Sequence, residues 1–246
     1  MPTLVHLSYS PWSENARWAL DHYGVEHRRV EHVPMIGEPL LRLVARRPFR
    51  RVTVPMLLDG PRVLADSWSI ARRAEELGSG PTLFAAEHLD EIGLLVARID
   101  AAMAAARARL TVRAVNDDGM LAESLPPFFI GPTRRMAVPL ARQGARFILR
   151  KYHGREHDLA AAEATVIAML DSLDEAIDDG PIFGSFSFAD IVACGLLQFV
   201  EPVADAWVPL GPATRAVWTD DALRDRYARL VAWRDGIYDA YRSRGA

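Results

Sequence analysis

A short strand that runs directly into a helix start is the feature that most limits how this chain can fold. The apolar stretch Leu4–Leu7 is followed by Tyr9, Ser10 and Pro11, and then by a helical pattern. Ser10 suits the N-cap because its oxygen can accept from the free amides of the first turn. Pro11 suits the first helical position, where its missing N–H costs nothing. Because a helix N-terminus is partly positive, this point favours a bound anion, including a thiolate.

The first 77 residues alternate between strand and helix patterns. Gly24 and Gly78 end two of the helical stretches, and Asp59-Gly60 is a strong hairpin signal. We expect the order β-α-β-α-β-β-α, a βαβ unit with parallel strands followed by an antiparallel ββα unit. This order matches a thioredoxin-like α/β arrangement. The expected strands are Leu4–Leu7, Val25–His32, Val52–Leu58 and Arg62–Ala65, and the expected helices are Pro11–Tyr23, Glu38–Arg46 and Asp66–Leu77.

The second part of the chain contains helical patterns and no convincing strand. We expect a thioredoxin-like domain over residues 1–78, a Gly- and Pro-containing linker over 79–86, and an all-α helical bundle over 87–246. Asn116–Gly131 is expected to be a loop, and Pro139 is expected to kink or delay a helix. The expected helices are Glu87–Arg113, Thr133–Tyr152, Leu159–Ile177, Ser187–Val200 and Ala222–Tyr241.

Composition argues against several classes of function. The net charge of −3 over 246 residues gives no reason to expect nucleic-acid binding. No apolar stretch approaches the roughly 18 residues of a membrane span, so no membrane partner is expected. The absence of a signal peptide and the single cysteine, Cys194, suit a reducing cytoplasm. Cys194 lies in an apolar helix pattern, where it is expected to pack, and the seven histidines show no metal spacing.

Four motifs stand out in the chain: Ser10-Pro11-Trp12-Ser13 with Arg17, Val54-Pro55, Asp66-Ser67, and Phe186–Ile191. Taken together, they resemble the glutathione transferase superfamily over essentially the whole chain. In the fourth, Ser187 and Asp190 occupy the N-cap and N3 positions of a capping box, with which the family begins the core helix of its helical domain. The resemblance implies that the N-terminal domain binds glutathione and that the helical domain borders the second substrate.

The resemblance implies that glutathione is the co-substrate and that Ser10 is the catalytic residue, which hydrogen-bonds the glutathione sulfur. A free thiol has a pKa of about 8.5, and its thiolate is the nucleophile. Lowering that pKa by about two units needs about 2.7 kcal/mol, which one hydroxyl donor and a helix N-terminus can supply. Ser10 would then be a donor and not a nucleophile. Ser13 is the alternative for this role, and a simple N-cap is the alternative for Ser10.

The same resemblance assigns glutathione binding to Val54, Pro55, Asp66 and Ser67. A cis peptide bond before Pro55 would expose the backbone of Val54, which pairs with the cysteine of glutathione like an added strand. Ser67 would donate to the γ-glutamyl carboxylate from a helix N-terminus, and Asp66 would meet the γ-glutamyl ammonium. One residue departs from the pattern: Thr53 stands where the family often has Lys, Gln or Arg.

For the second substrate, the resemblance implies a small hydrophobic electrophile and a pocket between the helical domain and Ser10. Conjugation, glutathione-dependent isomerisation, dehalogenation and peroxide reduction share the attack of the thiolate, as in detoxification, and the motifs do not choose among them. A homodimer is expected. The alternative is a non-catalytic carrier or interaction protein of the same fold, which Thr53 favours. Candidate pocket residues, for which core or dimer packing is the alternative, are Trp12, Ser13, Arg98, Phe128 and Phe129.

Overall fold

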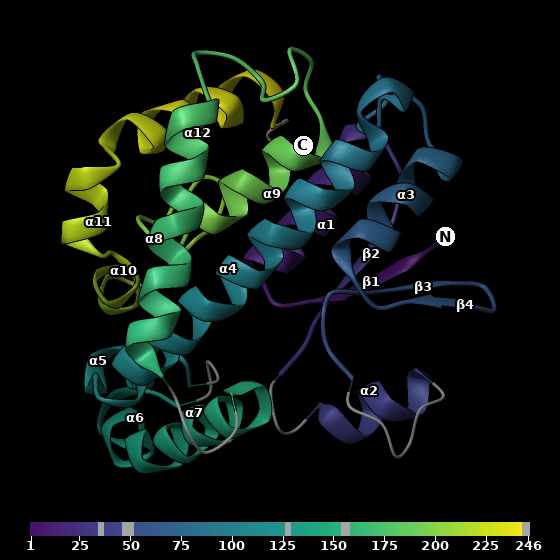
Figure 1. Cartoon of the computed structure of the whole chain (residues 1–246). Helices are drawn as coiled ribbons and strands as arrows, with labels where there is room; N and C mark the ends of the chain where they lie inside the picture. The colour runs from purple at the N-terminus through teal and green to yellow at the C-terminus, as the bar shows by residue number, and fades with distance from the viewer. Residues whose placement is uncertain (34–36, 46–51, 126–128, 154–157, 243–246) are drawn as a thin grey trace.

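The computed structural model describes residues 1–33, 37–45, 52–125, 129–153 and 158–242 (Figure 1). Its N-terminal part has the expected order and forms a four-stranded mixed sheet, β2-β1-β3-β4. β1 pairs with β2 in parallel and with β3 antiparallel, and β3 and β4 form the hairpin. The thioredoxin-like order is therefore confirmed. The elements are β1 (Thr3–His6), α1 (Pro11–His22), β2 (Arg28–Glu31), α2 (Glu38–Val44), β3 (Met56–Asp59), β4 (Arg62–Leu64) and α3 (Ser67–Leu77).

The two faces of the sheet pack into different hydrophobic clusters. Successive side chains of a strand point to opposite faces: Leu4 and Leu57 belong to the main cluster, whereas Val5 and Met56 belong to a smaller one. The smaller cluster includes Leu41 of α2. The main cluster includes residues of α1 and α3, which lie on the other side of the sheet (Figure 1). The sheet is thus covered by α2 on one face and by α1 and α3 on the other.

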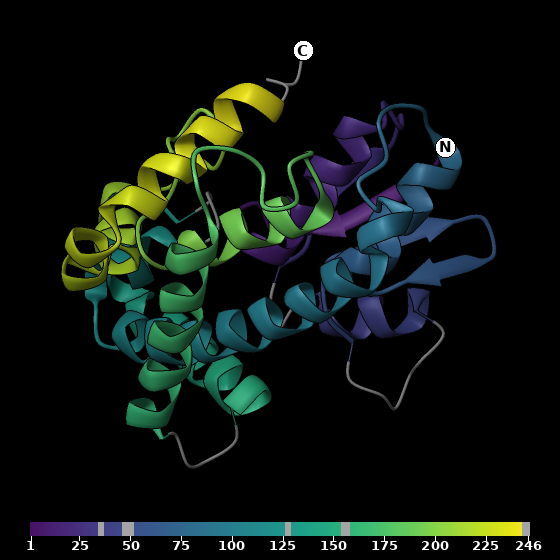
Figure 2. The same ribbon diagram turned by 45° about the horizontal axis from the view of Figure 1, so that its top comes forward.

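The helical part packs against the α1–α3 face without a separate core. α4 contacts both α8 and α9, and α1 contacts α9. Figure 2 shows α4 extending from the neighbourhood of α3 to that of α5. The main hydrophobic cluster therefore includes both parts of the chain. The helices are η1 (Ala86–His88, a 3-10 turn), α4 (Leu89–Val115), α5 (Asp118–Glu123), α6 (Gly131–Met136), α7 (Val138–His153), α8 (Leu159–Ala176), α9 (Phe188–Leu197), α10 (Pro212–Trp218), α11 (Asp221–Arg226) and α12 (Ala228–Tyr241).

Two expectations for the helical part were wrong because of local caps and breaks. The expected loop Asn116–Gly131 contains α5, which begins where the Asp117 side chain accepts from the Met120 N–H at 2.7 Å. The expected helix Ala222–Tyr241 is divided into α11 and α12 at Tyr227. The backbone of Tyr227 is not helical there, with φ −110° and ψ 32°.

Proline residues mark two further helix starts. The expected effect of Pro139 on the helix Thr133–Tyr152 is confirmed, because the helix is divided into α6 and α7 and Pro139 is the second residue of α7. In the first turn of a helix, a proline removes no intrahelical hydrogen bond. α10 was not expected from the sequence, and it begins with Pro212 in its first helical position.

At the start of α9, Asp190 makes the hydrogen bonds expected of the acidic residue in a capping box. Asp190 is fully buried, and its Oδ2 accepts from the Ser187 N–H at 2.8 Å and from the Ser187 hydroxyl at 2.7 Å. Its Oδ1 accepts from the Ile182 N–H at 2.8 Å. Asp190 thus joins the preceding loop to α9, all of whose residues are buried. In the described part of the chain, no helix is both long enough and apolar enough to cross a membrane.

Candidate functional site

Ser10 lies between β1 and α1, and its hydroxyl makes no hydrogen bond with the residues that the structure describes. It is the N-cap of α1 in an extended conformation, and its side chain makes no capping hydrogen bond. Its N–H donates to Leu7 O at 3.1 Å, and its carbonyl accepts from the Glu14 N–H at 2.9 Å. Pro11 takes the first helical position, as predicted. The half-buried Ser10 hydroxyl therefore lies at a helix N-terminus, where a bound anion is stabilised.

Ser13 has a structural role in the same turn. Its side chain is fully buried, and its hydroxyl oxygen accepts from the Leu7 N–H at 3.1 Å. The hydroxyl therefore satisfies the backbone of the residues that precede α1. Of the two serines considered for contact with sulfur, Ser10 is the one with an exposed surface.

Arg17 holds the backbone of the turn from inside the protein. Its Nη2 donates to Ser8 O at 2.8 Å, and its Nη1 donates to Leu7 O at 3.3 Å. Nη1 also donates to His6 Nδ1 at 2.9 Å. This contact requires an unprotonated Nδ1, and burial, followed by the charge of Arg17, lowers the pKa of His6 below its usual 6.5. A neutral imidazole and a buried guanidinium therefore fix the two residues that precede the Ser10 turn.

Glu14 links this turn to the C-terminal end of the last helix. Its Oε2 accepts from Arg17 Nε, and its Oε1 accepts from Arg242 Nε, both at 2.8 Å. Arg242 Nη1 also donates to Asp21 Oδ2 at 2.8 Å. Because Glu14 is 2% exposed, it is a buried charge whose two partners compensate for its removal from water.

Val54 and Pro55 lie at the start of the hairpin, and the peptide bond between them is cis, as predicted. The ladder between β1 and β3 begins at the pair Val5–Met56, so Val54 lies before it. Within the described residues, the N–H and C=O of Val54 have no backbone partner. The Val54 backbone is therefore free to pair with an extended peptide.

Asp66 and Ser67 form the start of α3, as predicted. Asp66 is the exposed N-cap, and its oxygens accept from the Ser69 N–H at 2.7 Å and from the Ser69 hydroxyl at 2.8 Å. Ser67 is the first helical residue and is buried. A carboxylate has about four acceptor sites, so Asp66 retains acceptor capacity toward a cation.

Asp100 is a candidate residue that sequence reasoning missed. Trp12 Nε1 donates to Asp100 Oδ1 at 3.1 Å, which joins α1 to α4 close to the Ser10 turn. Burial raises the pKa of Asp100 to about 6, the Trp12 hydrogen bond opposes this rise, and the charge of Asp66 adds to it. The charge of Asp66 is the smallest of these three contributions. The only signal in the sequence was one acidic residue between apolar neighbours, Ile99 and Ala101.

The candidate pocket residues Trp12 and Arg98 have different neighbours in the structure. Trp12 packs edge-on against Phe199, and the guanidinium of Arg107 lies 4.6 Å from the centre of the Trp12 ring. Arg98 lies about 200° around α4 from Asp100, and its Nη2 donates to Ser172 on α8 at 3.2 Å. The structure therefore does not bring Arg98 to the Trp12 side of α4.

Of the two phenylalanines of the expected pocket, the structure describes only Phe129. Phe128 lies outside the described residues. Phe129 is half-buried, and its carbonyl accepts from Arg134 Nε at 3.1 Å.

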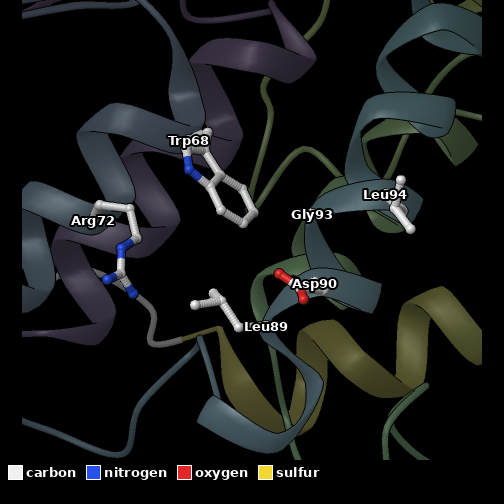
Figure 3. Close-up of a pocket in the computed structure, with 6 residues that line it drawn as sticks. All are labelled: Trp68, Arg72, Leu89, Asp90, Gly93 and Leu94. Carbon is white, nitrogen blue, oxygen red and sulfur yellow. The ribbon is translucent and has the colours of Figure 1, made fainter.

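An open hollow of about 590 Å³ lies between α3 and α4. Figure 3 shows Trp68 pointing across it toward Gly93. Trp68 follows Ser67 directly in the chain, but none of the predicted glutathione residues lines this hollow. The hollow is therefore a neighbour of the α3 N-terminus and not part of the Ser10 turn. Its lining residues are Trp68, Arg72, Leu89, Asp90, Gly93 and Leu94.

Cys194 is fully buried, and burial raises the pKa of its thiol well above the usual value. It is therefore a packing residue with an unreactive thiol. Among the residues that the structure describes, no three His, Cys, Asp or Glu side chains form a group that could hold a metal ion.

Comparisons with known proteins agree with this geometry. The glutathione S-transferase N-terminal domain family matches residues 9–77. A probable glutathione S-transferase from Solanum tuberosum is 25% identical over 234 residues, which are 94% of this chain and 83% of the relative.

Two solved structures have the same fold over nearly their whole length. A glutathione S-transferase from Methylobacillus flagellatus, crystallised with glutathione, has a TM-score of 0.62 at 15% identity and covers 97% of this chain and 95% of its own. A possible glutathione S-transferase from Rhodopseudomonas palustris has a TM-score of 0.59 at 17% identity, with coverage of 100% and 97%. The matched segment 9–77 contains Ser10, Val54-Pro55 and Asp66-Ser67. Residues 9–77 therefore match the glutathione S-transferase N-terminal domain family, and the whole chain has the fold of these two glutathione S-transferase structures.

Proposed function

We propose that this protein is a serine-type glutathione transferase in which Ser10 stabilises the thiolate of bound glutathione. The observation that carries this proposal is the Ser10 hydroxyl, which lies at the N-terminus of α1 and has no capping hydrogen bond. The backbone of the preceding turn is held by Arg17. The hydroxyl is thus held in place and can donate a hydrogen bond to a ligand. Preorganised donors of this kind stabilise developing or full negative charge.

Glutathione would lie along Val54 and reach the start of α3. The unpaired Val54 backbone supports a strand-like contact with its cysteine residue. At the other end, the amides of the first turn of α3 and the Ser67 hydroxyl would meet the γ-glutamyl carboxylate.

Asp66 and Asp100 together suit the γ-glutamyl ammonium. They are two carboxylates whose charges repel one another, so part of the rise in the pKa of Asp100 comes from Asp66. A cation bound beside both would relieve this repulsion and favour the ionised form of Asp100. The two carboxylates are therefore compatible with the ammonium group of glutathione.

The electrophile would lie on the helical side of the turn, bordered by Trp12. The thiolate attacks the electrophilic atom and forms the new bond to sulfur, while the electron pair moves to the leaving group or to the acceptor system. The aromatic side chain of Trp12, with Phe199 behind it, provides an apolar wall for a small hydrophobic compound.

Calorimetric titration with glutathione tests the proposed function. We expect binding in the micromolar-to-millimolar range for the wild type, and binding that is about 10- to 100-fold weaker for Ser67→Ala, because a hydrogen bond to a charged group is lost. Ser79→Ala is the matched control, since Ser79 is exposed in the segment after α3. If the folded wild type gives no heat, or if both variants bind equally, the glutathione site is refuted and a carrier of other ligands is favoured.

A further inference from the structure

The segment that forms α6 and α7 differs in charge from the rest of the chain. Between Gly131 and Arg150 there are five arginines and no acidic residue, although the net charge of the whole chain is −3. The remainder of the chain is therefore more acidic than the whole. The two helices lie together at one end of the molecule, beside α5 (Figure 1).

Three of these arginines carry a charge that the described residues do not neutralise. Arg135, Arg146 and Arg150 are exposed, and none of them forms an ion pair with any residue that the structure describes. Arg142, by contrast, pairs with Asp118 of α5. Arg146 and Arg150 are one helical turn apart, so they lie on the same side of α7.

The nearest acidic side chains on α5 are already engaged. Glu123 accepts from the Ala213 N–H at 3.0 Å and from the Thr214 N–H and hydroxyl, both at 2.7 Å, at the start of α10. Asp117 caps α5. Among the described residues, α5 therefore compensates Arg142 through Asp118 and acts on Arg134 through Glu123, but it forms no ion pair with Arg135, Arg146 or Arg150.

Large apolar side chains are exposed beside these cations. Ile130, Met136 and Leu140 are 73%, 80% and 56% exposed, respectively. Val138 is buried on the inner side of α7, which contacts α4 and α5. Leu140 lies about 80° around α7 from Arg150 and about 120° from Arg146, so all three can face solvent together. Exposed apolar side chains combined with arginines are typical of helices that lie in the interface of an anionic bilayer.

We propose that α6 and α7 form a docking surface for a membrane that carries anionic lipid. The guanidinium groups would meet lipid phosphates, while Met136 and Leu140 enter the boundary between headgroups and acyl chains. A nucleic acid would satisfy the arginines but would offer little to the apolar side chains. A helix that lies on a membrane needs no spanning stretch, so the lack of one in the sequence does not bear on this surface. The proposal does not depend on the proposed catalytic function.

Vesicle co-sedimentation with the full-length protein tests this surface. We expect binding to vesicles of phosphatidylcholine mixed with phosphatidylglycerol, weaker binding to phosphatidylcholine alone, and a decrease with salt. The triple variant R135Q/R146Q/R150Q should partition about a hundredfold less, because each basic residue near an anionic surface contributes about 1 kcal/mol. The triple variant R28Q/R62Q/R226Q removes the same charge from exposed arginines elsewhere and should bind like the wild type.

A second variant, M136Q/L140Q, separates lipid insertion from charge attraction alone. It should bind anionic vesicles more weakly than the wild type even at low salt, whereas its net charge is unchanged. The proposal is overturned if the wild type does not bind anionic vesicles, or if the two triple variants lose binding equally. It is also overturned if the protein binds a DNA duplex in place of vesicles and M136Q/L140Q has no effect.

Discussion

Replacing Ser10 by alanine removes the single hydroxyl that we place against the glutathione sulfur. The Ser10 side chain makes no capping hydrogen bond, so its loss should leave the folded structure nearly unchanged. Ser13 cannot take over the role, because its hydroxyl is fully buried and already accepts from the Leu7 N–H. The effect of the substitution therefore isolates one interaction with the thiolate.

The expected rise in the thiol pKa follows from the free energy of one hydrogen bond, converted into pKa units. A hydrogen bond to a charged group contributes about 1.5–3 kcal/mol, and one pKa unit corresponds to about 1.36 kcal/mol. The thiol pKa of bound glutathione should rise by about 1–2 units in Ser10→Ala. The N-terminus of α1 remains and contributes about 0.3–1 kcal/mol, so the pKa should stay below that of free glutathione. At a pH below both values, kcat/KM should fall about 10- to 100-fold.

The assay is the ultraviolet absorbance of the thiolate, titrated against pH with glutathione bound, which needs no knowledge of the electrophile. Affinity for glutathione should change little, since Val54 and Ser67 are intact. Ser10→Thr keeps the hydroxyl and is the matched control. An unchanged thiol pKa in Ser10→Ala, with glutathione still bound, would refute the role of Ser10 and leave it as a helix N-cap.

Three further substitutions test the surroundings of the site by urea denaturation. Burial raises the pKa of Asp100 from 3.8 to about 6. As pH rises from about 4 to 6, the wild type should therefore lose stability relative to Asp100→Asn, and parallel pH profiles would contradict this. Arg242→Ala removes one partner of the buried Glu14 carboxylate and should lower the free energy of unfolding by about 2–4 kcal/mol. A decrease below about 0.5 kcal/mol would show that this ion pair contributes little. Gly78→Ala would place its Cβ against the carbonyl oxygen of Tyr23 and should lower the free energy of unfolding by about 3 kcal/mol or more. Gly180 has open space around it, so Gly180→Ala should change that free energy by no more than about 0.5 kcal/mol. Equal stabilities of the two variants would refute the steric argument.

Local signals predicted the fold of the N-terminal part because neighbouring residues decide it. Pro11 starts α1, and Gly24, with φ of 63°, ends it at little steric cost. Asp59-Gly60 forms the turn between β3 and β4, where Asp59 pairs with Arg62. Each of these features depends on backbone geometry within a few residues.

The same kind of reasoning failed where a distant contact or an uncounted cap decides the structure. The break at Tyr227 accompanies a hydrogen bond from its hydroxyl to Asp171 on α8 at 2.6 Å. Hydrophobic periodicity continues through Tyr227, so the pattern alone predicts one helix. α5 was missed because a short polar helix has little periodicity to detect.

For the site, the sequence by itself determined which residues occur at the two helix starts and at the hairpin entry, namely Ser10, Val54-Pro55 and Asp66-Ser67. Only the tertiary structure decided that Asp100 meets Trp12, and that Arg242 reaches Glu14 from the far end of the chain. The physical reason is the separation along the chain between the residues that interact. Caps and turns depend on backbone groups a few residues away, whereas burial of a charge and the partner that compensates it are set by elements that meet only when the chain has folded.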